Sequence, residues 1–322
     1  MSLNEFGIIQ QFFSDLTGRR ADTLKGIGDD CAILQPRPDK LLVVSTDTLV
    51  AGRHFFTNAQ PENIGYKSLA VNLSDLAAMG AEPAWVSLAL TMPEADHAWL
   101  KDFVSGFGQL ARCHSLELIG GDLTRGPLSI TVTIHGYVSP GHVLQRQGAN
   151  AGDLVAVSGN LGSAALALQQ LMGLSAADSP EVDGDLLNAL NRPEPRIQLG
   201  MQLAQFATSC IDISDGLISD LGHICHASGC QAEIELPRLP CHPVVSAQIQ
   251  DTGCWDIPLT GGDDYELCFT LKPSDAGLLA DISQETGVAI TTVGKMKRGA
   301  GVVCMDEKHQ VVQIASSGFM HF

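Results

Sequence analysis

The sequence predicts an α+β protein of two domains. Segments of strand and helix character follow one another without a strict βαβ rhythm, and the polar, turn-rich stretch 139–153 separates two halves. A length of 322 residues with 45% hydrophobic content is enough to fill a core in each half. We therefore expect residues 1–140 to form a mixed β-sheet with helices, and residues 141–322 to form an α/β domain.

The periodicity of the apolar residues places the elements of each half. Apolar residues recur at helical spacing over 4–16, and "LLVVST" at 41–46 is typical of a strand that ends in a polar cluster. Pro61 and Gly80 suit the first turn and the end of a helix. The other elements expected before residue 139 are strands at 84–91, 116–120 and 128–138 and a helix near 96–113. Those expected after residue 153 are a strand at 154–158, helices near 162–172, 196–207 and 217–228, and strands with one helix from 265 onward.

Charge and cysteine content exclude several function classes. A net charge of −17 disfavours binding to a nucleic-acid backbone. The longest apolar runs are far shorter than the ~20 residues of a membrane span, and the N-terminus has no signal-peptide pattern. The nine cysteines include no C-x-x-C pair, so reduced thiols are expected, with Cys31 as a small buried filler or, because it stands beside the acids, as a functional residue. These features indicate a cytoplasmic protein that binds neither nucleic acid nor membrane.

Carboxylates stand beside glycine, serine or threonine at several places, most of them after an apolar run. They are Asp29 and Asp30 in "GIGDD", Asp47 in "STDTL", Asp75 in "NLSDL", Asp122 in "IGGDL", Asp212 and Asp215 in "DISDG", and Asp263 and Asp264 in "GGDDY". Because strand ends commonly meet at one edge of a sheet, we expect several of these to share a cleft. Two charges about 4 Å apart repel by roughly 4 kcal/mol at an effective dielectric of 20. Oxygen ligands of this kind suit magnesium.

Each acidic motif also has a structural alternative. Asp75 lies in an apolar helical pattern and would be solvated if it faced water. The paired aspartates are common turn residues, and Ser214 or Asp215 would suit the N-cap of the helix that follows. The chain contains no P-loop, no G-x-G-x-x-G at a helix start and no protein-kinase signature.

The motifs taken together resemble one family over about residues 26–319. They are "GIGDDCA", "STDTLVAGRHF", "YKSLAVNLSDLAAMGAEP", "LIGGDLTRGPL", "RQGANAGD", "RPEPR", "IDISDGLISDLGH" and "GGDDYEL", and their order and spacing resemble the thiamine-monophosphate kinases. These kinases belong to the superfamily of aminoimidazole ribonucleotide synthetase. The resemblance implies a two-domain fold, a homodimer joined through the N-terminal domains, and Mg-dependent transfer of a phosphoryl group from ATP to thiamine monophosphate.

The resemblance also implies roles for individual residues. Magnesium ligands carry over to Asp30, Ser45, Thr46, Asp47, Asp75, Asp122, Asp212 and Asp215. ATP contacts carry over to Gly121, Asp122, Arg146 and Ser214, and substrate contacts to His54, Asp263 and Phe319. At Asp263 the chain departs from the family's "GGEDYEL", because its side chain is one methylene shorter than glutamate.

The chemistry of the two phosphates suggests how the reaction proceeds. An acceptor phosphate is already ionised near neutral pH, so we expect direct in-line transfer without a protein base or a phosphoenzyme. Arg146 would steady phosphate charge through its fork of donors, or would pair with an acidic neighbour. Two other functions stay open from the residues alone. One is an ATPase that activates an amide oxygen for ring closure, as in aminoimidazole ribonucleotide synthetase, and the other is a non-enzymatic divalent-ion module.

Overall fold

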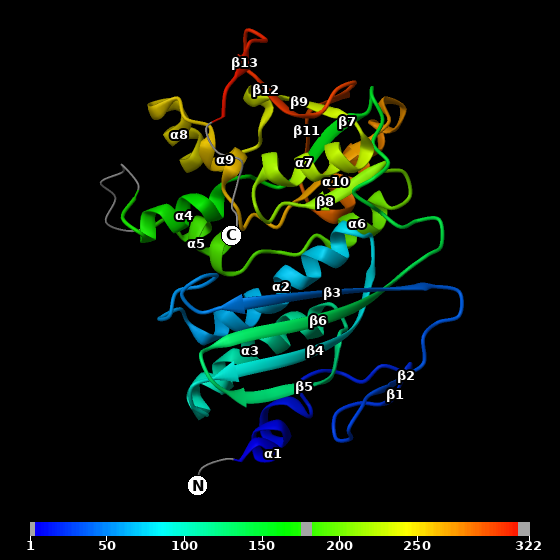
Figure 1. The fold of residues 1–322 in the computed structure, drawn as a ribbon, viewed down its shortest axis with the longest axis vertical. Helices are drawn as coiled ribbons and strands as arrows, with labels where there is room; N and C mark the ends of the chain where they lie inside the picture. The colour runs from blue at the N-terminus through cyan, green and yellow to red at the C-terminus, as the bar shows by residue number, and fades with distance from the viewer. Residues whose placement is uncertain (1–3, 175–181, 315–322) are drawn as a thin grey trace. The chain divides into compact units, whose positions relative to one another are not determined.

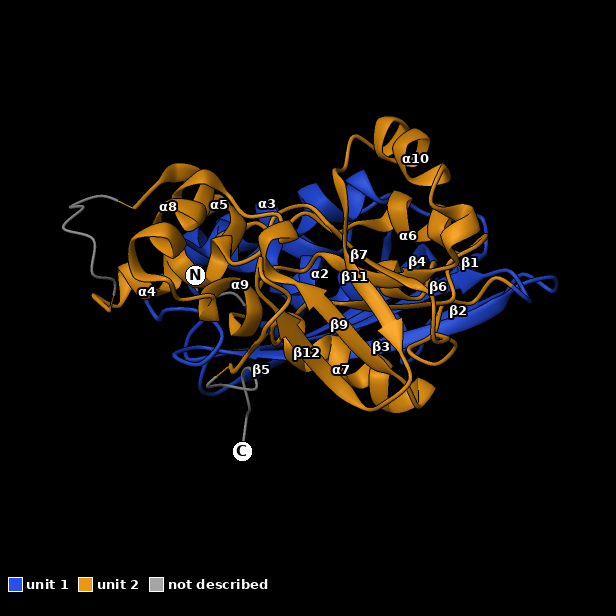
Figure 2. Cartoon of the chain, turned by 90° about the horizontal axis from the view of Figure 1, so that it is seen from above, with its two compact units in different colours: residues 1–76, 81–141 blue, residues 77–80, 142–322 orange. Residues whose placement is uncertain are grey.

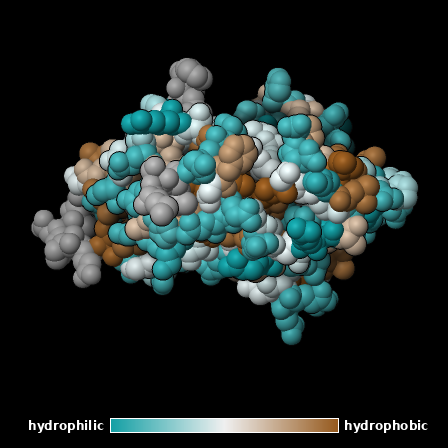
Figure 3. Space-filling model, turned by 90° about the horizontal axis from the view of Figure 1, so that it is seen from below, coloured by the Kyte–Doolittle hydropathy of each residue, from teal (hydrophilic) through white to brown (hydrophobic). Residues whose placement is uncertain are grey.

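The structure is a computed structural model that describes residues 4–174 and 182–314. The chain divides into two compact units (Figure 2). Unit 1 comprises residues 1–76 and 81–141, and unit 2 comprises residues 77–80 and 142–322. On the side drawn in Figure 3 the surface is mostly hydrophilic, with hydrophobic side chains in separate patches.

Unit 1 is built on a four-stranded mixed sheet. Its strands are β3 (Leu41–Val50), β4 (Glu82–Met92), β5 (Glu117–Arg125) and β6 (Ser129–Val138), in the order β3-β6-β4-β5. β6 is antiparallel to both β3 and β4, and β4 is parallel to β5. The short strands β1 (Thr23–Lys25) and β2 (Ile33–Leu34) form a separate antiparallel pair. β3 and β5 are therefore the two edges of the sheet.

Helices cover one face of this sheet (Figure 1). They are α2 (Pro61–Ala78) and α3 (His97–Cys113). The short N-terminal helix α1 (Glu5–Ile8) continues into a π-helical turn, η1 (Ile9–Phe13). Pro61 opens α2, where its missing N–H costs nothing, and Gly80 follows the helix with φ +68°. The opposite face carries hydroxyl side chains, with Thr46 bonded to Thr133 at 2.9 Å and Thr48 to Thr131 at 2.8 Å.

Two glycines let α2 and α3 touch backbone to backbone. A Cβ added at Gly65 of α2 would lie 2.0 Å from the carbonyl oxygen of Phe103 in α3. A Cβ at Gly106 of α3 would lie 1.9 Å from the carbonyl oxygen of Glu62 in α2. Real Cβ atoms do not approach so closely, so any larger residue forces the two helices apart.

Unit 2 contains a seven-stranded sheet with the order β13-β12-β9-β11-β7-β10-β8. The strands are β7 (Leu154–Ser158), β8 (Ser209–Asp212), β9 (Gln231–Glu235), β10 (Leu267–Leu271), β11 (Ile290–Lys297), β12 (Gly301–Met305) and β13 (Val311–Val312). All neighbours are antiparallel except β12 and β9, which are parallel.

Helices pack around this sheet and against one another. They are α4 (Ser163–Leu171), α5 (Gly184–Asn191), α6 (Ile197–Leu203), α7 (Leu217–Ser228), α8 (Pro243–Thr252), α9 (Asp256–Thr260), α10 (Leu278–Thr286) and the 3-10 turns η2 (Leu236–Arg238) and η3 (Pro273–Asp275). Leu217, Leu221 and Ile224 of α7 share one core with buried residues of the sheet. A second core joins α4, α5, α8 and α9.

Most expected elements are present, with changed ends. The N-terminal helix is partly π-helical, the strand expected at 41–46 runs on to Val50, and the helix expected at 196–207 ends at Leu203. Periodicity missed the short elements β1, β2, β8, β9, α5, α8 and α9. All nine cysteines are free, as expected. Within the described residues, no helix has the length and apolarity needed to cross a membrane.

We predict that Gly106→Ala destabilises unit 1 by about 3 kcal/mol or more, because the new methyl group meets backbone that cannot yield. Gly108→Ala is the matched control on the same helix, since its Cβ meets only the side-chain ends of Leu16 and Arg112. Denaturant unfolding measures both free energies. Equal losses in the two variants would contradict the close contact between the helices.

Candidate functional site

The first acidic group of unit 1 lies where β3 meets α2. Ser45 and Asp47 point to the α2 side of β3, and the Ser45 hydroxyl donates a short hydrogen bond to Asp75 of α2. Asp47 and Asp75 interact directly, and both are half-buried. Burial first, and the Asp75 charge second, raise the pKa of Asp47 to about 6. Asp75 therefore does not occupy a freely solvated helix face, and its group is one that a cation would stabilise.

Asn72 supports this group from inside the helix. It is fully buried one turn before Asp75, and its Nδ2 donates to the Ser68 carbonyl at 3.0 Å. Its Oδ1 accepts the backbone N–H of Asp47 at 3.2 Å. The amide thus uses both ends and fixes β3 to α2 beside the two carboxylates.

The second acidic group lines a cavity of about 730 Å³ within unit 1. Asp30 and Asp122 both border it, together with Gly120 and Gly121 of β5. A Cβ at Gly121 would lie 1.8 Å from the carbonyl oxygen of Leu88, so only glycine fits there. The cavity combines carboxylates and exposed glycine backbone with an apolar wall, which suits a partly apolar ligand whose polar part is cationic or reaches the carboxylates through a metal ion.

The neighbours of Asp30 have different tasks. Asp29 accepts the backbone N–H of Asp30 at 3.0 Å and pairs with Lys25 at 3.2 Å, and these two contacts lower its pKa. Asp29 therefore bonds the local backbone, and it also borders the cavity. Cys31 is exposed and borders the same cavity, so the expectation that it is a buried filler is wrong.

Within one copy of unit 1 the two acidic groups are separate. Asp47 lies on edge strand β3, on the α2 side of the sheet. Asp122 lies on the other edge strand, β5, opposite Ala89 and on the face that carries Thr131. Three strand spacings, or ~14 Å, separate the edges. Asp47 and Asp122, two of the carboxylates expected to share a cleft, are therefore not neighbours within a single copy of this sheet.

In unit 2, the buried carboxylate of Asp220 accepts hydrogen bonds from the backbone of the acidic loop after β8. Asp212 ends β8 and is buried, and Ser214 and Asp215 follow it. Both backbone N–H groups donate to Oδ2 of Asp220, at 2.9 and 3.0 Å. Burial raises the pKa of Asp220 to about 7. Gly216 is the N-cap of α7, so neither Ser214 nor Asp215 has that role.

The "GGDDY" segment lies directly against this loop. Asp263 donates its backbone N–H to the Ser214 carbonyl at 2.9 Å. Asp264 accepts the backbone N–H of Gly162, with burial raising its pKa well above the ordinary range. The structure thus brings the candidate residues Asp212, Ser214, Asp215 and Asp263 together in one part of unit 2.

The remaining candidates are more dispersed. His54 follows β3, and its Nδ1 accepts the backbone N–H of Val50 at 2.9 Å. Thr46 lies on the hydroxyl-bearing face of the sheet in unit 1, and Arg146 is exposed in unit 2. Phe319 lies outside the described residues. The roles carried over to these residues remain predictions.

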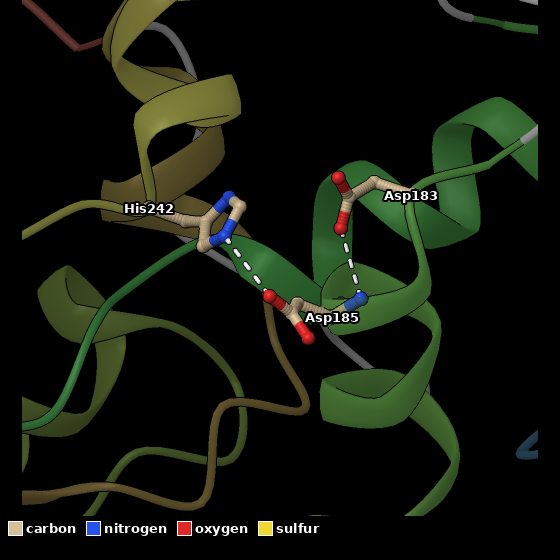
Figure 4. Close-up of side chains that lie close together, drawn as sticks. All are labelled: Asp183, Asp185 and His242. Carbon is tan, nitrogen blue, oxygen red and sulfur yellow. Dashed lines mark hydrogen bonds and ion pairs between the residues drawn. The ribbon is translucent and has the colours of Figure 1, made fainter.

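A third cluster of possible metal ligands has a structural explanation. Asp183, Asp185 and His242 of unit 2 each place one possible ligand atom within 4.8 Å of the others (Figure 4). Asp183 is the N-cap of α5 and accepts the Asp185 N–H at 2.8 Å, while His242 caps α8 through the Val244 N–H at 3.4 Å. His242 Nε2 lies 3.8 Å from Asp185. Helix capping accounts for this arrangement.

Sequence reasoning missed the residues that hold the candidate ligands in place. Asn72, Asp220 and Tyr265 each bond directly to a candidate residue or its backbone. A usable signal existed for Asn72, because a polar amide in an apolar helical pattern requires a partner when buried. Asp220 and Tyr265 gave no such signal.

The chain matches two family profiles. Residues 28–138 match "AIR synthase related protein, N-terminal domain", and residues 150–307 match "AIR synthase related protein, C-terminal domain". It is 44% identical over 323 residues to the thiamine-monophosphate kinase of Escherichia coli K12, covering 100% of this chain and 99% of that protein.

Two solved structures extend this likeness to the fold. The thiamine-monophosphate kinase from Stenotrophomonas maltophilia has a TM-score of 0.86 and 44% identity, covering 94% of this chain and 97% of that one. The structure described as AaThiL complexed with AMPPCP and TMP has a TM-score of 0.76 and 29% identity, covering 99% and 97%.

We predict that the Asp47–Asp75 pair makes the protein less stable as pH rises. The pKa of Asp47 is about 6 in the folded chain against an ordinary 3.8, so unfolding releases a proton between these values. In metal-free buffer the wild type should therefore lose stability relative to Asp47→Asn between pH 4 and pH 7, by at most about 3 kcal/mol. Thermal unfolding across this range measures the difference. Parallel curves for the two proteins would contradict the pairing.

Proposed function

This chain belongs to the AIR synthase related family, and within it to the thiamine-monophosphate kinases, and we propose that the reaction of these kinases takes place at the acidic sites described above. The chain is an ATP-dependent kinase that phosphorylates thiamine monophosphate to thiamine diphosphate. The full-length likeness is to kinases, so the ring-closing ATPase is not favoured. The terminal phosphoryl group of ATP passes directly to the acceptor phosphate, which completes thiamine diphosphate biosynthesis.

The observation that carries the metal part of this proposal is the Asp47–Asp75 pair. Two interacting carboxylates and the Ser45 hydroxyl present only oxygen atoms, and burial together with the Asp75 charge raises the pKa of Asp47 to about 6. Such a donor set fits Mg²⁺. We propose that Asp30, Thr46, Asp122, Asp212 and Asp215 complete the ligands. When bound, Mg²⁺ would neutralise phosphate oxygens of two anionic substrates.

The chain's own residues would then bind and orient the two substrates. Gly121 and Ser214 offer positions for ATP, and the exposed Arg146 offers a fork of donors for phosphate. His54, Asp263 and Phe319 would contact thiamine monophosphate, Phe319 by stacking on its aromatic, cationic ring. No residue is assigned as general base, because the acceptor oxygen carries no proton that must leave. Residues 1–140 would supply most metal contacts, and residues 141–322 would complete the substrate site.

We further propose a homodimer joined through unit 1. One copy would supply Asp47 and Asp75, and its partner would supply Asp30 and Asp122, since a single sheet keeps the two groups at opposite edges. The face of β3 that carries Thr46 supports a dimer joined through unit 1. Its exposed apolar side chains alternate with inward ones and are Leu42 (43% exposed), Val44 (56%) and Val50 (38%).

The cysteines indicate the compartment. All nine are free, and Cys210, Cys225, Cys230, Cys268 and Cys304 are buried. Burial raises the pKa of Cys304 to about 11, which keeps its thiol protonated and unreactive. Reduced thiols of this kind are typical of a reducing environment, and we place the enzyme in the cytoplasm.

We predict that Asp75→Asn folds but loses activity by at least about a hundredfold, because a neutral amide cannot balance bound cations. Product is measured as thiamine diphosphate formed from ATP, Mg²⁺ and thiamine monophosphate, and Mg²⁺ binding by calorimetry. Asp102→Asn, an exposed carboxylate on α3, serves as the control and should behave like the wild type. Full Mg²⁺ response in Asp75→Asn would remove Asp75 from the site.

We predict that two inactive variants restore activity when mixed. A dimer of Asp75→Asn with Asp122→Asn has both defects in one shared site and none in the other, so an equal mixture should regain about a quarter of wild-type activity. Activity is measured after subunit exchange, with sedimentation to establish the oligomeric state. A mixture as inactive as its components, or a monomeric wild type, would contradict the shared site.

A further inference from the structure

The segment 261–266, between α9 and β10, has an unusual backbone. Asp263 has φ +70° and Tyr265 has φ +49°, so two non-glycine residues separated by one position are both left-handed. An aromatic side chain in this conformation is a genuine outlier. Such strain persists only where the surrounding structure holds it.

Backbone pairing with the loop after β8 provides that hold. The Asp263 N–H donates to the Ser214 carbonyl at 2.9 Å, and the Tyr265 N–H donates to the Ile213 carbonyl at 2.8 Å. The Ile213 N–H in turn donates to the Glu266 carbonyl at 2.8 Å. The segment is thus fastened to the same loop that carries Ser214 and Asp215.

A buried ion pair anchors the end of the segment. Arg196 donates to both oxygens of the Glu266 carboxylate, at 2.8 and 2.6 Å. The Ser158 hydroxyl adds a bond of 2.5 Å to Glu266. Glu266 is 6% exposed, and a bidentate pair in such a site permits little movement. The backbone beside Tyr265 is therefore held in place.

The two left-handed residues bring their side chains together. The Tyr265 hydroxyl donates to Oδ1 of Asp263 at 3.0 Å. A hydroxyl bonded to a carboxylate is a charge-assisted hydrogen bond, which is stronger than one between neutral groups. It restricts rotation of the Asp263 carboxyl group.

We propose that Tyr265 is a positioning residue that aims the Asp263 carboxylate at the substrate. The inference rests on the proposed function, in which Asp263 contacts thiamine monophosphate. The short side chain of Asp263 brings its carboxylate within reach of a hydroxyl two residues further on. The aimed carboxylate would recognise the cationic ring or an amino N–H of the substrate, and it would take no part in phosphoryl transfer.

The test replaces Tyr265 by phenylalanine in the full-length enzyme. This change removes one hydroxyl and keeps the aromatic ring and its backbone preference. We expect the KM for thiamine monophosphate, and its Kd by calorimetry, to rise about tenfold, the loss of one hydrogen bond to a charged group. The KM for ATP and the melting temperature should stay unchanged. Tyr137→Phe is the matched control, because that hydroxyl lies in unit 1 near Asp22 and the N–H of Arg37, and it should change neither constant.

A double variant separates positioning from general support. If Tyr265 acts only through Asp263, then Asp263→Asn with Tyr265→Phe binds thiamine monophosphate no more weakly than Asp263→Asn alone. Unchanged substrate affinity in Tyr265→Phe, an equal rise in both KM values, or additive losses in the double variant would overturn the inference while leaving the kinase activity in place. A wild type that forms no thiamine diphosphate would overturn the proposed function itself.

Discussion

The burial of two interacting carboxylates beside each other is the constraint that the surrounding structure of unit 1 has to meet. Asp47 and Asp75 are half-buried and interact directly, and burial first and the Asp75 charge second raise the pKa of Asp47. The interaction would be lost if β3 and α2 moved apart. The surrounding structure therefore has to prevent that movement.

Each neighbouring feature of unit 1 opposes that movement. The buried amide of Asn72 bonds to both elements. The close backbone contact at Gly65 and Gly106 leaves no space between α2 and α3 into which α2 could move. In unit 2, too, neighbouring residues hold acidic residues in place through hydrogen bonds. There, Asp220 holds the loop of Ser214 and Asp215 through their N–H groups, and the strained segment at Asp263 pairs with that loop. In both units, residues of no direct chemical use hold the acidic ones in place.

The sequence predicted the longer elements and the acidic motifs, but not the way the motifs combine. Pro61, Gly80 and an apolar run were sufficient for α2, because local signals set helix ends. Strand order is not local. The sequence places Asp47 and Asp122 at the ends of similar apolar runs, and only the order β3-β6-β4-β5 puts them at opposite edges. Likewise, the partners of Asn72 and Tyr265 depend on contacts between segments, which spacing along the chain does not specify.

The burial of α2 has a consequence for how this protein can change over generations. From Ile64 to Leu76 every residue is buried or half-buried, including the polar Lys67, Ser68, Asn72 and Ser74. A surface helix has one side on which mutations are neutral, but this helix has none. We therefore expect few substitutions to be tolerated in α2. A stretch such as "LAVNLSDLAAMGA" should change more slowly among relatives than the exposed loops do.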